Sequence, residues 1–509
     1  MHVKKDEHKL EYKLDIINER FKDCDDLVIR EFDVGVENEC KMALVYIDGM
    51  TDKALISEFA LNNLMVASRL AMPNDIKNNI KDLIKKKNIA ITEIKEVKEI
   101  EEIINNVLVG ETLLFIDNVE EAIILSSRGW PTRSISEPQS EVVIRGPRDG
   151  FTETLKVNTS LVRRRIRDTN FKIKNLSLGE RSKTDVALLY VEDIVNDKVL
   201  EEVKKRLDEI DIDMIQESGD IEQLIEDSCY SLFPQIQYTE RPDVIAASLY
   251  EGRVAILVDN TPFGLIVPVT LTTFLQSPDD YYERWIISTF VRMIRLLATG
   301  FSLFLPALYI AISSYHPDML PTDLALYLAA TRQGVPFPAF TEAFVMEITL
   351  ELLREAGARL PKAIGSTIGI VGGLVIGQAA VQAGIVSPLM VIIVAITAIS
   401  SFATPSYNMA IGFRMLRFIF MLMASVLGLY GIILGFLVML INLSNLRSFG
   451  VPYLEPLCSV GENFKDLKDT VIRAPMPSMN SRPKMYTKKN RNRLDDKRKE
   501  IFGEDDIEK

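Results

Sequence analysis

Long stretches without a charged side chain occupy the second half of the chain and constrain its fold more than any other feature. Residues 363–413 hold 51 consecutive uncharged side chains, and residues 418–446 hold 29 more. Residues 296–315 form a third uncharged stretch. A helix needs about 20 apolar residues to cross a bilayer. The first and last stretches therefore predict one membrane span each, and the middle stretch predicts two.

Glycine and proline divide the middle stretch at Gly384-Ile-Val-Ser-Pro388, a sequence that favours a tight turn. We therefore predict a membrane domain over residues 281–457. Its four expected spans cover about 293–314, 363–384, 388–406 and 418–443.

The segment 320–358 is amphipathic and acidic, which is unusual for a helix that faces lipid along its length. One interpretation is a helix in the membrane interface, with solvated carboxylates and an ion pair between Glu351 and Arg354. The other interpretation is that Glu342, Glu347 and Glu351 line a water-filled mouth that concentrates cations. The segment either lies in the headgroup plane or dips into the membrane and returns where protein covers it, and in both cases we expect it not to cross.

Basic residues that precede and follow the membrane domain in the sequence predict its orientation, because lysine and arginine are enriched in the cytoplasmic segments of membrane proteins. Six lie between 482 and 493 with no acidic residue among them, and three arginines between 284 and 295 precede the first span. Both chain ends are therefore expected in the cytoplasm, which requires an even number of crossings. Arg414 and Arg417 disagree, because they precede the last expected span and would lie outside.

An internal repeat organises the first 280 residues. Residues 35–48 resemble residues 179–192, and Leu113–Asn118 resembles Ala255–Asn260. Buried apolar runs that alternate with helical patterns are typical of α/β subdomains with covered sheets. We therefore expect an α/β double domain, with subdomains over 35–140 and 175–280, followed by an α-helical polytopic membrane domain. Two flanking segments complete this division, a charged N-terminal segment over 1–34 and a tail over 458–509.

A basic helix is expected in the linker 141–174, between the two subdomains. The sequence leaves three roles open for it: a solvated or salt-bridged linker, a clamp between domains or subunits, or a contact with anionic lipid. Its four arginines are our candidates for subunit contacts: Arg163, Arg164, Arg165 and Arg167.

Composition and motifs argue against several classes of protein. A net charge of −12 and a pI near 5.1 disfavour a nucleic-acid binder. Four scattered cysteines give neither a disulfide framework nor a zinc ribbon. The chain has three histidines and no phosphate-binding, nucleophile-elbow or metalloprotease motif. We expect no enzymatic activity, no cofactor and no metal site.

Small residues form a stripe along the second expected span. The four glycines of the stripe fall every fourth residue: Gly365, Gly369, Gly373 and Gly377. In lipid such a stripe allows two helix backbones to approach closely. Gln378 and Gln382 lie one turn apart on a neighbouring face, and an amide that faces lipid is costly.

Two interpretations of this helix remain open. The glutamines can hydrogen-bond to another helix of the same subunit, or several copies of the helix can surround a shared axis. In the second case Ile364, Ile368 and Val371 would form an apolar gate, and Gln378 and Gln382 would hydrate ions.

Several long runs in this sequence are distinctive: RGPRDGFTETLKVNTSLVRRRIRD, GERSKTDVALLYVED, YTERPDV, LVDNTPFGLIVP, FATPSY and SFGVPYLEP. A further run contains the glycine stripe, RLPKAIGSTIGIVGGLVIGQAAVQAGIVSP at 359–388. Runs this long, in this order, are highly specific. Through them, and over nearly its whole length, the chain resembles the A subunit of the GerA family of spore germinant receptors.

The resemblance implies a cytoplasmic double α/β domain and a multi-pass membrane domain in the inner membrane of a bacterial endospore. It implies a homo-oligomer, a pentamer, that acts as a nutrient-gated channel for monovalent cations. The implied partners are a permease-like B subunit, a lipoprotein C subunit and membrane lipid, with no nucleic acid. The alternatives are a non-conducting sensor or scaffold subunit, a secondary transporter, or an amplifier like the related stage V sporulation AF protein.

Overall fold

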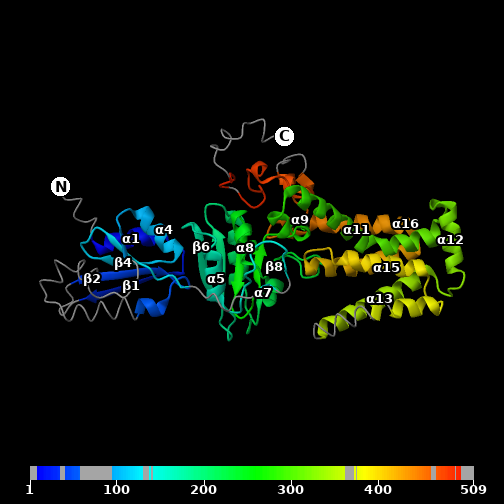
Figure 1. Cartoon of the computed structure of the whole chain (residues 1–509), viewed down its shortest axis with the longest axis horizontal. Helices are drawn as coiled ribbons and strands as arrows, with labels where there is room; N and C mark the ends of the chain where they lie inside the picture. The colour runs from blue at the N-terminus through cyan, green and yellow to red at the C-terminus, as the bar shows by residue number, and fades with distance from the viewer. Residues whose placement is uncertain are drawn as a thin grey trace. The chain divides into compact units, whose positions relative to one another are not determined.

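Two five-stranded sheets with the same strand order form the N-terminal part of the computed structural model (Figure 1). The structure describes residues 9–34, 40–57, 94–129, 137–138, 141–360, 372–373, 375–459, 466–487 and 489–493. The first sheet contains β1 (Leu27–Val34), β2 (Cys40–Ile47), β3 (Ile94–Val97), β4 (Thr112–Ile116) and β5 (Ala122–Leu125). The second contains β6 (Phe171–Leu178), β7 (Thr184–Val191), β8 (Gln237–Thr239), β9 (Val254–Val258) and β10 (Gly264–Val267).

The strand orders confirm the internal repeat. The first sheet runs β1-β2-β4-β5-β3 and the second β6-β7-β9-β10-β8, with antiparallel pairing between all these neighbours. The central strands are buried along nearly their whole length because helices cover them. These helices are α1 (Leu10–Arg20), α4 (Ile100–Val109), α5 (Leu155–Arg163), α6 (Asp197–Asp208), α7 (Ser218–Ile225) and α8 (Pro242–Tyr250).

The repeat begins earlier than the sequence suggested. The N–H of Leu10, the first residue of α1, donates to Asp117 Oδ1 at 2.9 Å, and the N–H of Leu155, which begins α5, donates to Asp259 Oδ1 at 2.9 Å. Asp117 directly follows β4, and Asp259 directly follows β9. Each aspartate accepts a hydrogen bond from an N–H group at a helix N-terminus that has no partner within the helix. Residues 1–34 and 141–174 are therefore not simple flanking and linker segments, since α1, β1, α5 and the start of β6 belong to the subdomains.

The chain divides into two compact units. The first, the α/β unit, contains Met1–Glu226, Ile236–Pro268 and Asn480–Arg498. The second, the helical bundle, contains Asp227–Gln235, Val269–Met479 and Lys499–Lys509. A segment near the C-terminus thus belongs to the same unit as the N-terminal sheets.

Helices α11, α13, α15 and α16 lie side by side in the helical bundle (Figure 1). Two of its helices, α11 and α16, are long and apolar enough to cross a membrane, and α15 is a shorter apolar helix. The bundle contains α9 (Leu271–Leu275), α10 (Asp279–Tyr282), α11 (Trp285–Tyr315), α12 (Thr322–Arg332), α13 (Ala339–Arg359), α15 (Pro388–Ser401) and α16 (Tyr407–Asn445), and a β11 (Arg447–Ser448) to β12 (Val451–Pro452) hairpin.

The turn expected at 384–388 is confirmed. Gly384 has φ +66°, in the left-handed region that glycine tolerates, and α15 begins at Pro388 with the Ser387 side chain as its N-cap. α15 then ends at Ser401 and α16 begins at Tyr407.

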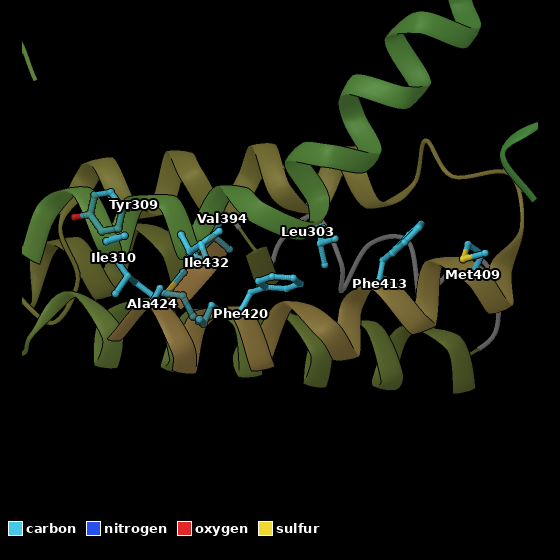
Figure 2. Close-up of a cluster of buried hydrophobic side chains, with 14 of the residues drawn as sticks. Leu303, Tyr309, Ile310, Val394, Met409, Phe413, Phe420, Ala424 and Ile432 are labelled. Atoms are coloured by element: carbon cyan, nitrogen blue, oxygen red, sulfur yellow. The ribbon is translucent and has the colours of Figure 1, made fainter. Parts of the chain in front are cut away.

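α16 is a hairpin of two antiparallel arms, not the single span expected over 418–443. Gly428 has φ +62° and ψ −139°, which interrupts the helix. The rings of Phe420 and Phe436 lie 4.9 and 5.8 Å from the ring of Phe304. A straight helix would separate residues 16 positions apart by about 24 Å. Figure 2 shows side chains of both arms, Phe420 and Ile432 among them, in one buried cluster with Leu303.

Contacts at successive levels give the helix directions. Arg417 of the first α16 arm contacts Ser302, and Tyr315 donates to the Ser425 carbonyl, so this arm runs parallel to α11. Tyr309 meets Ser387 at the start of α15, whereas Thr299 meets Thr404 just after its end. α15 therefore runs opposite to α11.

α13 runs parallel to α15, because Glu342 accepts a hydrogen bond from the Ser387 N–H and Arg354 donates to Ser401. A Cβ on Gly372 would lie 3.0 Å from Leu353 of α13, and a Cβ on Gly384 would lie 3.3 Å from the Gly334 carbonyl. The helical residues 375–382 therefore run opposite to α13. α13 thus packs against α11, α15 and α16 as a member of the bundle.

Candidate functional site

A fully buried ion pair joins α13 to the first arm of α16. The Arg417 guanidinium contacts the Glu347 carboxylate at 2.5 Å, and both side chains are 0% exposed. Arg417 Nε also donates to the Ser302 carbonyl of α11 at 2.6 Å. Because an unpaired charge in an apolar interior is very costly, each partner depends on the other.

The other two carboxylates proposed for the cation mouth are also paired. Glu342 is buried and contacts Arg332 of α12 at 3.2 Å. Glu351 contacts Arg354 at 2.8 Å, the expected pair, and Arg414 at 3.2 Å.

These pairs correct two expectations from the sequence. Glu342, Glu347 and Glu351 do not form an acidic mouth for cations, since arginines of the same chain neutralise them. Nor are the carboxylates simply solvated, because Glu342 and Glu347 are buried in the bundle. The charges on α13 and α16 compensate each other.

Arginines at the start of α11 are likewise compensated. Asp280 of α10 is 2% exposed and lies between Arg292, at 3.1 Å, and Arg295, at 2.9 Å. Arg292 also contacts Asp469 at 3.0 Å. These pairs fix the entry of α11 into the bundle against residues that follow α16 by some 20 positions in sequence.

The glycine stripe is only partly within the described residues. Ile364, Ile368 and Val371, the gate candidates, and Gly365 and Gly369 of the stripe lie outside them.

Gly373 and Gly377, the two described glycines of the stripe, have different surroundings. A Cβ built on Gly373 meets no described atom within 4 Å, whereas one on Gly377 would lie 3.5 Å from Val391 of α15. Gln378 and Gln382 are exposed, and within the described ranges neither amide has a hydrogen-bond partner. The face with Gln378 and Gln382, here called the open glycine face because it flanks the stripe, is therefore not packed against the described part of its own chain. Gly373, about 140° or more away around an ideal helix, is open as well.

Arg163 in the α/β unit is buried and clamps the two subdomains together. Its guanidinium contacts both Asp26 oxygens at 2.8 Å and donates to the Phe171 carbonyl at 2.9 Å. It also lies 4.4 Å from the centre of the Phe171 ring. Such a bidentate, nearly dry pair holds its geometry strictly.

The four linker arginines therefore differ in burial and in whether they are already paired within the chain. Arg163 is occupied inside the chain and is not available to a neighbouring subunit. Arg165 contacts Asp149 at 2.6 Å, and Arg164 is half-buried. Arg167 is exposed, and subunit contact remains a prediction for Arg164, Arg165 and Arg167.

Glu141 is a titratable residue that the sequence analysis missed. Thr239 Oγ1 donates to its carboxylate at 2.5 Å, and Arg241, which is fully buried, donates to its backbone carbonyl at 3.2 Å. Burial raises the pKa of Glu141 to about 7, against the lowering effect of Thr239 and Arg241. Its contact with strand β8, next to the matched YTERPDV segment, was the available signal.

Glu141→Gln is expected to change how stability depends on pH. Because its pKa lies above the usual carboxyl value in the folded state, Glu141 contributes stability below about pH 4.5 that is lost as pH rises through about 7. The variant should lose this decline and be more stable than the parent chain above neutrality. Thermal unfolding of the full chain in detergent, from about pH 5 to about pH 8, measures the effect.

Glu137→Gln is the matched control, because Glu137 is half exposed and, among the residues that the structure describes, pairs with an exposed arginine, Arg148. Parallel pH profiles for Glu141→Gln and the parent chain would contradict the assignment. The charged groups around Glu141 are Arg241 and Glu240, and neither is changed.

No group of three His, Cys, Asp or Glu side chains is placed to hold a metal ion in the part of the chain that the structure describes. The chemically distinctive features are thus the ion pairs inside the bundle and the open glycine face. Paired charges can hold helices in register, and an exposed polar face can meet water or a second chain.

Residues 15–485 match the family described as Bacillus/Clostridium GerA spore germination protein. The chain is 46% identical over 466 residues to spore germination protein KA of Bacillus subtilis (strain 168), a match that covers 92% of this chain and 84% of that protein. It is 43% identical to Uncharacterized membrane protein YfkQ of the same strain, with 92% and 89% covered. It is 32% identical to Stage V sporulation protein AF of that strain, with 90% and 92% covered.

Among solved structures, the chain is similar to the N-terminal domain of the A subunit of the Bacillus megaterium spore germinant receptor GerK3. The identity is 35% and the TM-score 0.40, and the match covers 51% of this chain and 95% of the solved chain.

Proposed function

Because this chain belongs to the GerA family of spore germination proteins, we propose that it is the A subunit of a nutrient-responsive germinant receptor. In this proposal several copies form a channel in the spore inner membrane and release monovalent cations at the start of germination. The chain acts with a permease-like B subunit and a lipoprotein C subunit, and it has no enzymatic role or cofactor. The family membership supports the germination role, and the geometry of the bundle supports the membrane passes and the channel.

The proposed topology has both chain ends in the cytoplasm and six passes through the membrane. Residues 480–493 belong to the α/β unit, so the segments before and after the bundle lie on one side and the number of passes is even. The alternating directions support passes by α11, α13, the helix that includes 375–382, α15 and the two arms of α16. The sequence had suggested four, since it left α13 and the second arm of α16 out.

The observation that carries the channel proposal is the open glycine face. Two amides, Gln378 and Gln382, are exposed on a helix whose other described side chains are apolar or small. Contact with lipid would cost these amides their hydrogen bonds, so the face must meet water or protein. A ring of copies places both amides on a wet axis, and Gly373, on the other side of the helix, allows a neighbouring helix to approach closely. Ile364, Ile368 and Val371 remain the candidates for its apolar gate.

Gly373→Leu is expected to prevent assembly while leaving the single chain folded. The leucine would enter open space in its own chain, but it would push away a helix of another copy that approaches at Gly373. Size-exclusion chromatography with light scattering, on the full chain in detergent, should show a shift from oligomer to monomer. Gly300→Leu on α11 is the matched control, because a Cβ there also meets nothing within 4 Å of the described atoms, and it should assemble normally.

Ion flux tests the function itself. The full chain, reconstituted into potassium-loaded vesicles with its receptor partners and nutrient, should conduct, and Gly373→Leu should reduce the flux to the level of empty vesicles. An oligomer without flux would overturn the channel and leave the sensor or amplifier role. Coupled, saturable uptake of a substrate would instead identify a transporter. The nutrient can open the channel only if the bound receptor prefers the open state.

A further inference from the structure

The C-terminal segment occupies a position in the second subdomain that the first subdomain fills with its own neighbouring residues. In the first subdomain, Thr51 forms an antiparallel bridge with Arg128, which follows strand β5. In the second, Val195 forms the same kind of bridge with Thr487. Val195 is 144 positions after Thr51, the offset of the repeat, so the two bridges are equivalent.

The C-terminal segment can take this place because of the path that the chain follows after β10. In the first subdomain the chain continues from β5 back to the bridge, where the Asp52 N–H donates to the Ser127 carbonyl at 2.8 Å. In the second subdomain the chain leaves after Pro268 to enter the helical bundle. The equivalent position is therefore free for another segment, and residues 480–493 take it.

Two glycines in equivalent places support this correspondence. Gly110 and Gly252 follow helices α4 and α8 with φ of +96° and +93°. A Cβ on Gly110 would lie 3.0 Å from the Met50 carbonyl oxygen, and one on Gly252 would lie 3.2 Å from the Ile194 carbonyl oxygen. The second glycine faces the C-terminal segment as well, since its Cβ would lie 2.8 Å from the Tyr486 carbonyl oxygen.

The segment binds through one aromatic anchor. The side chain of Tyr486 is 2% exposed, and the Arg253 guanidinium lies 4.5 Å from the centre of its ring. Thr487, next to it, is 1% exposed. A buried aromatic residue beside a guanidinium is the kind of contact that dominates the affinity of a docked segment.

Charge complementarity surrounds the anchor. Arg493 contacts Glu251 at 3.1 Å, Lys489 contacts Asp197 at 2.8 Å, and Arg482 Nε donates to the Tyr250 carbonyl at 2.7 Å. The segment also closes on itself as a hairpin, with a bridge between Ser481 and Asn492.

We propose that residues 480–493 form a detachable strap, and that the surface around Val195, Gly252 and Arg253 is its docking site. The docked strap completes the second subdomain and ties the chain that leaves α16 back to the sheets. The chain also passes between the two units after Glu226, Gln235 and Pro268, so the strap adds a further such point in the sequence. The docking itself is independent of the proposed channel, whereas a role in transmitting the nutrient signal rests on the proposed function.

Limited trypsin digestion of the full chain in detergent tests the docking. The strap is rich in lysine and arginine, so trypsin cuts it readily only when it leaves its site. Tyr486→Ala should speed cleavage between 482 and 493 at least about tenfold, and Tyr486→Phe, which keeps the ring beside Arg253, should not. Tyr230→Ala is the control, because Tyr230 is 95% exposed.

Equal protection of the strap in Tyr486→Ala and in the parent chain would overturn the proposal. So would faster cleavage throughout the chain, since that would show general unfolding and not release of the strap. Arg493→Glu provides a second variant that cannot disturb the core, because Arg493 is partly exposed, and it should also speed cleavage of the strap.

Spores that carry Tyr486→Ala separate the docking from the channel. With normal protein levels, the proposal expects a reduced response to nutrient together with normal oligomers and normal flux in vesicles once opened. An unchanged response, with the strap released, would overturn the transmitting role. If neither the parent chain nor Gly373→Leu conducted ions in vesicles, that result would instead count against the proposed function.

Discussion

Replacing Arg417 with methionine is expected to destabilise the helical bundle by about 3–5 kcal/mol. The change leaves the Glu347 carboxylate, 0% exposed, without the guanidinium that lies 2.5 Å from it. It also removes the donor to the Ser302 carbonyl, which ties α16 to α11. Glu347→Met should cost a similar amount of stability, because it leaves the buried Arg417 charge without its partner. The thermal unfolding midpoint of the full chain in detergent, followed by intrinsic fluorescence, measures both.

The double variant with methionine at both positions tests whether the stability is lost because one buried charge is left unpaired. An apolar pair of similar volume often replaces a buried ion pair at little cost, so the double variant should recover most of the stability. Arg359→Met is the matched control on the same helix, because its pair with Glu355 is largely exposed and should contribute less than about 1 kcal/mol. A double variant no more stable than the single ones would mean that the pair is not what holds α13 in the bundle.

Gly428→Ala is expected to destabilise the bundle by about 2–5 kcal/mol, the sum of backbone strain and crowding. The residue has φ +62° and ψ −139°, a conformation that only glycine adopts readily. A Cβ there would also lie 3.1 Å from the Cβ of Tyr315, at the end of α11. The two arms of α16 would then lose the turn that brings them side by side.

Gly300→Ala is the control for this substitution. Gly300 lies inside α11, and a Cβ there meets nothing within 4 Å in the described ranges, so the change should be neutral or slightly stabilising. If Gly428→Ala unfolds at the same temperature as Gly300→Ala, α16 does not reverse at Gly428. A continuous helix of 39 residues would then replace the hairpin.

Local patterns in the sequence were enough to predict the repeat and the limits of several elements. The apolar runs at Leu113 and Ala255 are buried central strands, as expected, because a strand covered on both faces must be apolar throughout. Asn118 and Asn260, which end these two runs, have φ of +58° and +68°, a backbone conformation that asparagine tolerates in turns. The turn before Pro388 follows from the chemistry of glycine and proline alone.

Pairing between distant charges could not be predicted in the same way. Glu347 and Arg417 lie 70 positions apart, and on its own each looks like a solvated or interfacial charge. Only their contact shows that α13 belongs inside the bundle. The hairpin in α16 was missed for a related reason, since a glycine in an apolar run is equally compatible with a helix and with a reversal.

The sequence by itself determined which segments are apolar, where the chain repeats and which family it belongs to, because these follow from composition and order along the chain. The tertiary structure alone decided which charges cancel, where α16 turns back, and that residues 480–493 complete the second subdomain. Those outcomes depend on which distant residues meet, and a buried charge or an empty strand position is stable only with its partner in place.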